Sequence, residues 1–151
     1  MPDPLTHVCL TWLGGRAARL RAAMPALLVG ALLPDVLYVV PWIASVSHTP
    51  LALVVVAYAG ALLFRARDRR AVFLGLVAGA WSAVGLDVLQ DHLTGGYMLL
   101  FPFYWGEFEA HVIDPEGSVL WLPYIVGGTL LVELALYLRR RLLRRSPAGR
   151  G

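Results

Sequence analysis

The chemistry that this sequence could carry begins with two acids and a histidine at the end of an apolar run. Asp87 and Asp91 are four residues apart, and His92 follows directly. On a helix, residues four apart share one face, so the two carboxylates would repel each other unless a cation or a proton lay between them. Carboxylates in an apolar helix are also costly to bury without a partner. This stretch is therefore interpreted as half of a metal site.

Three polar residues earlier in the chain, His7, Asp35 and His48, are predicted to supply the other half. Mixed histidine and carboxylate ligands suit Zn²⁺, Mn²⁺ or Fe²⁺. Such an ion lowers the pKa of a bound water and presents it as a nucleophile, or it polarises a phosphoryl or carbonyl oxygen. We expect His7, Asp35, His48, Asp87 and Asp91 to ligate one or two metal ions.

Each candidate residue also has a structural interpretation. His7 could be an interfacial polar residue, His48 a loop residue, and Asp35 the cap of a second half-helix after Pro34. Glu133, inside the last apolar run, could pair with a neighbouring helix or mark a polar pathway.

Two further histidines are candidates for protonating a leaving group. His92 lies one residue off the face that Asp87 and Asp91 would share, and His111 lies in an acidic loop over residues 107–118. Histidine is the commonest general acid at neutral pH, so we expect His92 or His111 to act in catalysis.

The composition is that of a membrane protein. Of the 151 residues, 58% are hydrophobic and 15% are charged, and the mean hydropathy is +0.66, whereas a soluble domain has roughly a quarter of its residues charged. All 13 basic residues are arginines clustered beside apolar runs, which favours a cytoplasmic membrane flank over nucleic-acid binding. The single Cys9 excludes an intrachain disulfide. Asp3 and the lack of a basic segment at the N-terminus argue against a cleaved signal peptide.

The apolar pattern predicts an all-α polytopic membrane protein with about three to four full spans plus short or re-entrant helices. A single domain is expected over residues 1–145, with a disordered tail over 146–151. Glycines should end the first helix, Pro34 should kink or break the second, and Ser47 or Thr49 should cap the third. The arginines at 65–70 should form a tight loop, and residues 93–106 should form a re-entrant or interfacial segment. The expected helices cover residues 4–14, 50–64, 71–86 and 119–138, and a further helix lies in the apolar stretch 24–46, where Pro41 should end it.

The arginine clusters predict the orientation and a common depth for the site. Alternating crossings place residues 16–21, 65–70 and 139–145 on one side, which the positive-inside rule makes cytoplasmic. About 16 uncharged residues separate His48 from the second cluster, and about 16 separate that cluster from Asp87. At 1.5 Å per residue, both side chains should lie roughly 24 Å from the basic end, near the outer interface.

Five short motifs follow one another along the chain: Thr6-His7, Gly30-Ala31-Leu32-Leu33-Pro34-Asp35, Ser47-His48-Thr49, Asp87-Val-Leu-Gln-Asp91 and Leu100-Phe101-Pro102-Phe103. Their order and spacing resemble a known family, the membrane-bound metal-dependent hydrolases known as LexA-regulated inner-membrane hydrolase-like proteins. The resemblance spans residues 6 to about 103, and it implies a metal-dependent hydrolase of a bacterial inner membrane. The family's His-x-x-x-Asp stands here as Asp87-x-x-x-Asp91, a more oxygen-rich pair that would favour Mn²⁺ or Mg²⁺ over Zn²⁺. The Pro-Asp and His pattern is also similar to zinc-dependent phospholipase C proteins, which implies a phosphoester or lipid headgroup as substrate.

Two other function classes stay open at this point. A non-catalytic scaffold, or degenerate hydrolase, would use the polar residues as caps, and its small size and partial spans are compatible with a homo-oligomer. A transporter would use Asp35, Asp87 and Glu133 as a polar path, although the sequence has no visible internal repeat of the kind many transporters show.

Overall fold

The described chain is built from helices. The computed structural model describes residues 4–89, 96–110, 112–113 and 115–145. Within these ranges there is no strand, and an isolated antiparallel bridge joins Tyr97 and Phe108. The predicted all-α class is confirmed. The helices are α1 (Pro4–Ala17), η1 (Arg21–Ala23), α2 (Met24–Tyr38), η2 (Ala44–Val46), α3 (Pro50–Leu62), α4 (Ala66–Val88) and α5 (Pro115–Arg145).

Three helical stretches are long and apolar enough to cross a membrane: Arg21–Tyr38, Ala66–Val88 and Leu120–Leu143. The apolar helix α3 is shorter. Large apolar side chains on the outside of these helices, such as Val29, Val55 and Leu131, are more than half exposed. An exterior this apolar fits hydrocarbon better than water, so the chain is a small helical membrane protein.

The centre of the molecule is the crossing of α2 and α4, where small residues let the two backbones touch. A Cβ atom at Gly30 would collide with the carbonyl oxygen of Leu76, and one at Gly79 would collide with that of Leu27. Lipid offers little hydrophobic drive for helix pairing, so membrane helices associate where small residues allow such close contact. This contact fixes how far α2 can slide along α4.

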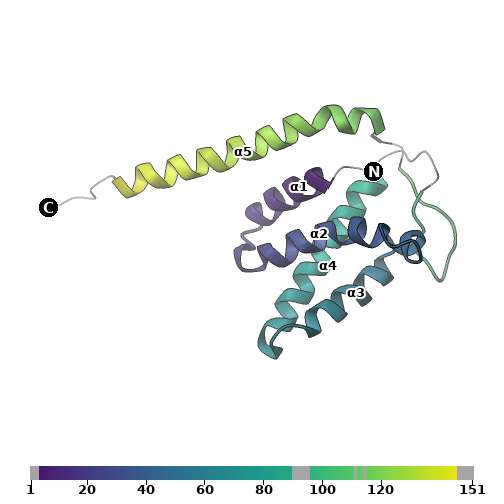
Figure 1. The fold of residues 1–151 in the computed structure, drawn as a ribbon. Helices are drawn as coiled ribbons and strands as arrows, with labels where there is room; N and C mark the ends of the chain where they lie inside the picture. The colour runs from purple at the N-terminus through teal and green to yellow at the C-terminus, as the bar shows by residue number, and fades with distance from the viewer. Residues whose placement is uncertain (1–3, 90–95, 111, 114, 146–151) are drawn as a thin grey trace.

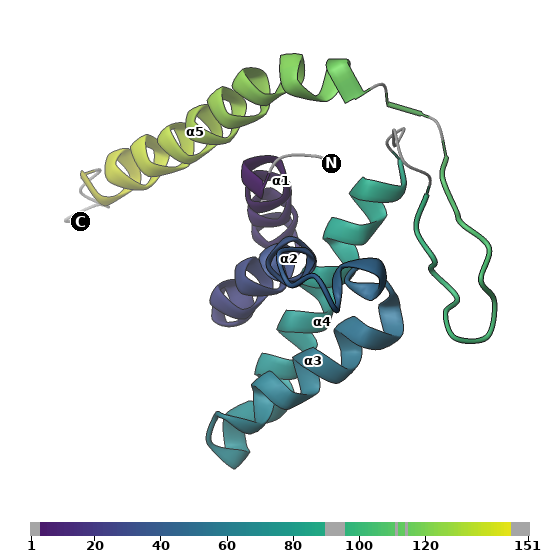
Figure 2. The ribbon, with the colours of Figure 1, turned by 45° about the vertical axis from the view of Figure 1, so that its right-hand side comes forward.

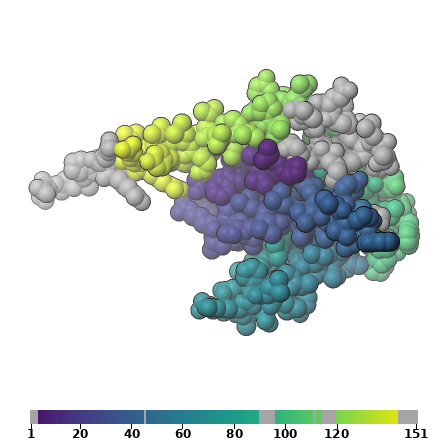
Figure 3. All heavy atoms as spheres, viewed as in Figure 1, coloured from purple at the N-terminus to yellow at the C-terminus, as the bar shows by residue number. Residues whose placement is uncertain are grey.

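A second contact joins the first and last helices, because α5 runs along α1 and away from the other helices (Figure 2). In the space-filling view α5 forms a band beside α1 (Figure 3). Trp12 Nε1 donates to Glu133 Oε1 over 2.7 Å, and Arg16 Nη2 donates to Glu133 Oε2 over 2.8 Å. The Arg16 guanidinium also lies 5.7 Å from the Trp12 ring centroid. Glu133 therefore pairs with a neighbouring helix, one of the two roles that its position in the sequence suggests.

The helices run antiparallel, so chemically similar ends gather together (Figure 1). The end of α1, the α3–α4 turn and the end of α5, which carry the arginines, lie on the left in Figure 1. The end of α2, the start of α3 and the end of α4 lie on the right, where the segment 96–113 folds back.

Several predicted boundaries are wrong, each for a local reason. Gly14 and Gly15 do not end α1, because Gly15 lies inside the helix against the Met24 side chain. Pro34 does not break α2, which continues to Tyr38. The arginines after Arg65 do not form a loop, because α4 begins at Ala66.

The predicted start of α3 is confirmed. The Thr49 side chain accepts a hydrogen bond from the backbone N–H of Ala52, and Pro50 occupies the first turn, where its missing N–H costs nothing. Of the two predicted caps, Thr49 is the N-cap of α3 and Ser47 is not.

Candidate functional site

Four of the five predicted ligands meet at one end of the helix bundle. His7 Nδ1 lies 3.3 Å from Asp35 Oδ2, and His7 Nε2 lies 3.3 Å from Asp87 Oδ1. His48 Nε2 lies 3.2 Å from the other carboxylate oxygen of Asp87. The predicted common depth of His48 and Asp87 is therefore confirmed, and Asp87 stands between two histidines.

Each residue of this cluster comes from a different helix or its flank. His7 lies in the first turns of α1, Asp35 in the last turns of α2, His48 just before α3 and Asp87 just before the end of α4. Antiparallel helices of similar length bring such positions to the same end. We call these four residues the His–Asp cluster.

The orientation of His48 is set by Ser47. The Ser47 hydroxyl donates to the carbonyl oxygen of Ala44 over 2.9 Å, which uses its only proton. Its oxygen therefore accepts from His48 Nδ1, 2.8 Å away. When His48 is neutral, its Nε2 consequently carries a lone pair, and that lone pair faces Asp87.

The orientation of His7 is set by Asp35 in the same way. The carboxylate of Asp35 can only accept, so Nδ1 of His7 carries the proton that joins them. Burial lowers the pKa of His7, but its contacts with Asp35 and Asp87 and their negative charge outweigh burial and raise the pKa to about 9. The surroundings of His7 are thus strongly attractive to positive charge.

The cluster is buried, and its facing atoms are poorly satisfied. His7 and Asp87 are fully buried, and His48 is 3% exposed. Four of their atoms make no hydrogen bond within the described structure: Nε2 of His7, Nε2 of His48 and both carboxylate oxygens of Asp87. Buried polar atoms are rarely left this way, and a group of them facing one another calls for an explanation.

Tyr97 forms one wall of the site, and sequence reasoning missed it. Its ring stacks on the His48 ring with centroids 4.4 Å apart. The segment that carries it is attached to the end of α4, because the N–H of Ala110 donates to the carbonyl oxygen of Val88 over 2.8 Å. Burial, together with the charges of Asp87 and Asp35, raises the pKa of Tyr97, so the side chain stays a neutral phenol.

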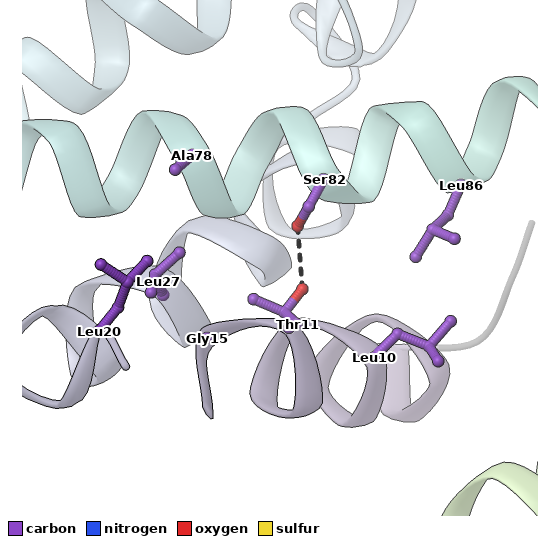
Figure 4. Close-up of a pocket in the computed structure, with 9 residues that line it drawn as sticks. Leu10, Thr11, Gly15, Leu20, Leu27, Ala78, Ser82 and Leu86 are labelled. Carbon is purple, nitrogen blue, oxygen red and sulfur yellow. Dashed lines mark hydrogen bonds between the residues drawn. The ribbon is translucent and has the colours of Figure 1, made fainter. Parts of the chain in front are cut away.

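An apolar cavity of about 330 Å³ lies between α1 and α4, beside the cluster. Leu10 lies one turn beyond His7 on α1, and Leu86 directly precedes Asp87 on α4 (Figure 4). Thr11 and Ser82 meet across it at 2.9 Å. Because the Ser82 hydroxyl donates to the carbonyl oxygen of Gly79, Thr11 is the donor in that pair. Among the side chains that line the cavity, the polar ones are thus Thr11 and Ser82, and a hydrogen bond joins the two.

The structure does not place the remaining predicted site residues. Asp91, His92 and His111 lie outside the described residues. Glu133 lies with Arg16 at the α1–α5 contact, so it does not extend a polar path from the cluster. Within the described ranges, no group of three or more His, Cys, Asp or Glu side chains is arranged to hold a metal ion.

Comparisons with family models, with curated proteins and with solved structures found no match to this chain. What the site does must therefore be argued from its geometry.

Proposed function

We propose that this protein is a membrane-embedded metal-dependent hydrolase in which His7, His48 and Asp87 hold one divalent cation. The observation that carries the proposal is the set of four buried atoms without hydrogen bonds, both Nε2 atoms and both Asp87 oxygens. When the His48 ring is neutral, its Nε2 carries a lone pair that points at the Asp87 carboxylate, and the two repel each other. A cation between them turns that repulsion into ligation.

The donor types suit such an ion, but the three side chains are not arranged around a common centre in this structure, so binding would require them to shift. Two histidines and one carboxylate are a known ligand set for catalytic Zn²⁺, and the same donors suit Fe²⁺ and Mn²⁺. His7 and His48 approach different oxygens of Asp87, at 3.3 Å and 3.2 Å.

The other residues of the site support the ligands. Asp35 lies on Nδ1 of His7, the ring nitrogen away from Asp87. This favours an orienting role for Asp35 over the ligand role that the sequence predicts. Ser47 orients His48 in the same way, and such partners fix the tautomer and raise the basicity of the ligating nitrogen. The Tyr97 ring keeps water from one face of His48.

The chemistry proposed is hydrolysis of a phosphoester. A bound divalent ion would lower the pKa of its water and neutralise charge on a phosphoryl oxygen. Protonation of the leaving group by His92 or His111, and a contribution from Asp91, remain predictions.

A lipid headgroup is the favoured substrate. The apolar cavity beside Leu10 and Leu86 offers space for an acyl chain next to the His–Asp cluster. We infer that the arginine-bearing ends face the cytoplasm of a bacterial inner membrane and that the site faces outward, because membrane proteins retain arginine on the inner side.

The test is the metal content of detergent-purified protein freed of any histidine tag. We expect one Zn, Mn or Fe per chain in the wild type, and loss of the ion together with phosphodiesterase activity in Asp87→Asn. Asp68→Asn is the matched control, because Asp68 lies on the same helix but is exposed and pairs only with Arg67. A wild type that holds no metal after loading with each ion would contradict the proposal and favour a non-catalytic scaffold. Bound metal without phosphoester hydrolysis would contradict the substrate class alone.

A further inference from the structure

A second pocket, of about 340 Å³, lies at the other end of α1 from His7, between α1 and α5. Its walls combine arginines with apolar side chains. Four arginines line it, from the end of α1, the turn that follows and the last turns of α5: Arg16, Arg19, Arg21 and Arg140. Leu13 and Leu136 contribute to the apolar part. None of these residues belongs to the His–Asp cluster.

The positive charge of this pocket is largely uncompensated. Arg16 is neutralised by Glu133, whose carboxylate lies 2.8 Å from the Arg16 Nε. In the part of the chain that the structure describes, no carboxylate pairs with Arg19, Arg21 or Arg140. The junction of α3 and α4 also carries four arginines and one carboxylate, Asp68, which pairs with the exposed Arg67, so the net charge of the two places is the same. The pocket differs because its arginines line a hollow between two helices.

The backbone conformation of Arg19 is a second observation about this pocket. Arg19 has a positive φ of 60°, a conformation that usually belongs to glycine. It ends α1 in a Schellman motif, in which the N–H of Leu20 donates to the carbonyl oxygen of Gly15 over 2.8 Å. A glycine would adopt this conformation without the steric cost that a side chain carries, so the arginine stands here against the local backbone preference.

We propose that this pocket binds the phosphate group of an anionic membrane lipid. Guanidinium groups match phosphate geometry through paired hydrogen bonds, and basic pockets between membrane helices on the cytoplasmic side bind such headgroups. Leu13 and Leu136 continue the pocket toward the apolar span, where an acyl chain of the same lipid would lie. That continuation favours a lipid over free phosphate.

The experiment is a titration of the purified full chain in detergent, with bound lipid counted by native mass spectrometry. The probes are phosphatidylglycerol, phosphatidylcholine with the same acyl chains, and inorganic phosphate. We expect preference for phosphatidylglycerol and a loss of about fivefold in its affinity for each of Arg19→Gly and Arg140→Gln. Arg67→Gln is the matched control and should change the affinity little.

Arg19→Gly separates binding from folding, because it removes the charge and also relieves the backbone. Its thermal stability should equal or exceed that of the wild type while its lipid affinity falls. Equal binding of the two lipids, or an equal loss in Arg67→Gln, would overturn the proposal. Inorganic phosphate that binds as tightly as phosphatidylglycerol would overturn the assignment to a lipid.

Discussion

The two ends of α1 carry polar clusters that are built in opposite ways. At one end, His7, His48 and Asp87 are buried, and four of their facing atoms lack hydrogen bonds. At the other end, Arg16 and Trp12 both donate to a partly exposed Glu133. The second cluster is explained by folding alone, since it fastens α5 to α1. The first leaves four buried atoms without hydrogen bonds, and that difference is why we place the proposed hydrolytic site at this end of α1.

A change at the α2–α4 contact should separate the two clusters most strongly. Asp35 and Asp87 of the His–Asp cluster lie on these two helices, whereas Glu133 lies on α5 and its partners on α1. Gly79→Ala would drive a Cβ into the backbone of Leu27, and overpacking of this kind costs about 3 kcal/mol. We expect lower thermal stability and loss of metal binding. Gly85→Ala is the control, because a Cβ there meets nothing within 4 Å, and it should be neutral or slightly stabilising. Equal loss in both variants would mean that the close contact does not limit packing.

An added metal ion should raise the melting temperature through the His–Asp cluster and not through Glu133 and its partners. An ion at 100 times its dissociation constant stabilises the folded state by about 2.7 kcal/mol. We expect the melting temperature of chelator-treated wild type to rise on adding the preferred ion, and that of Glu133→Gln to rise equally. Asp87→Asn should show no rise. A rise of equal size in Asp87→Asn would place the binding elsewhere.

Ser47→Ala tests whether the hydrogen bond between Ser47 and Nδ1 of His48 supports metal binding. Loss of such a partner typically weakens metal binding 10–100-fold, and His48 would lose the acceptor that fixes its tautomer. Isothermal titration with the preferred ion measures the change. Thr129→Ala is a control of the same kind, since Thr129 also donates to a backbone carbonyl, that of Ile125, but lies on α5. Affinity unchanged by Ser47→Ala would remove Ser47 from the site.

The smallest effect is expected at the other end of α1. Glu133→Gln removes a partly exposed ion pair, which should cost about 1 kcal/mol of unfolding free energy in detergent. Metal content should stay unchanged, because Glu133 lies outside the His–Asp cluster. A fall in metal content would show that α5 supports the site after all.

The positions that follow from counting residues along a helix could be predicted from the sequence. Equal apolar lengths on either side of the arginine turn predict that His48 and Asp87 share a depth, and they lie 3.2 Å apart. The start of α3 at Pro50 followed from local capping chemistry. These features depend on helix rise and caps, which short stretches of sequence carry.

The features that depend on side-chain direction and loop path were missed. The sequence predicts a capping role for Ser47, and nothing in its neighbourhood indicates that it orients His48. Tyr97 follows two glycines in an aperiodic stretch, so no pattern predicts that its ring stacks on His48. Pro34 shows the converse: its local rule predicts a kink or a break, and of these the break does not occur, because α2 continues through it to Tyr38.

The close contact of α2 and α4 also constrains how this chain can change over generations. Asp35 lies five residues beyond Gly30, and Asp87 lies eight beyond Gly79, so the two carboxylates stand about 7.5 Å and about 12 Å along their helices from the glycines. One residue inserted in either interval would turn its carboxylate by about 100° around the helix and away from His7. Relatives that keep this chemistry should therefore vary freely in loop length while conserving both intervals to the residue.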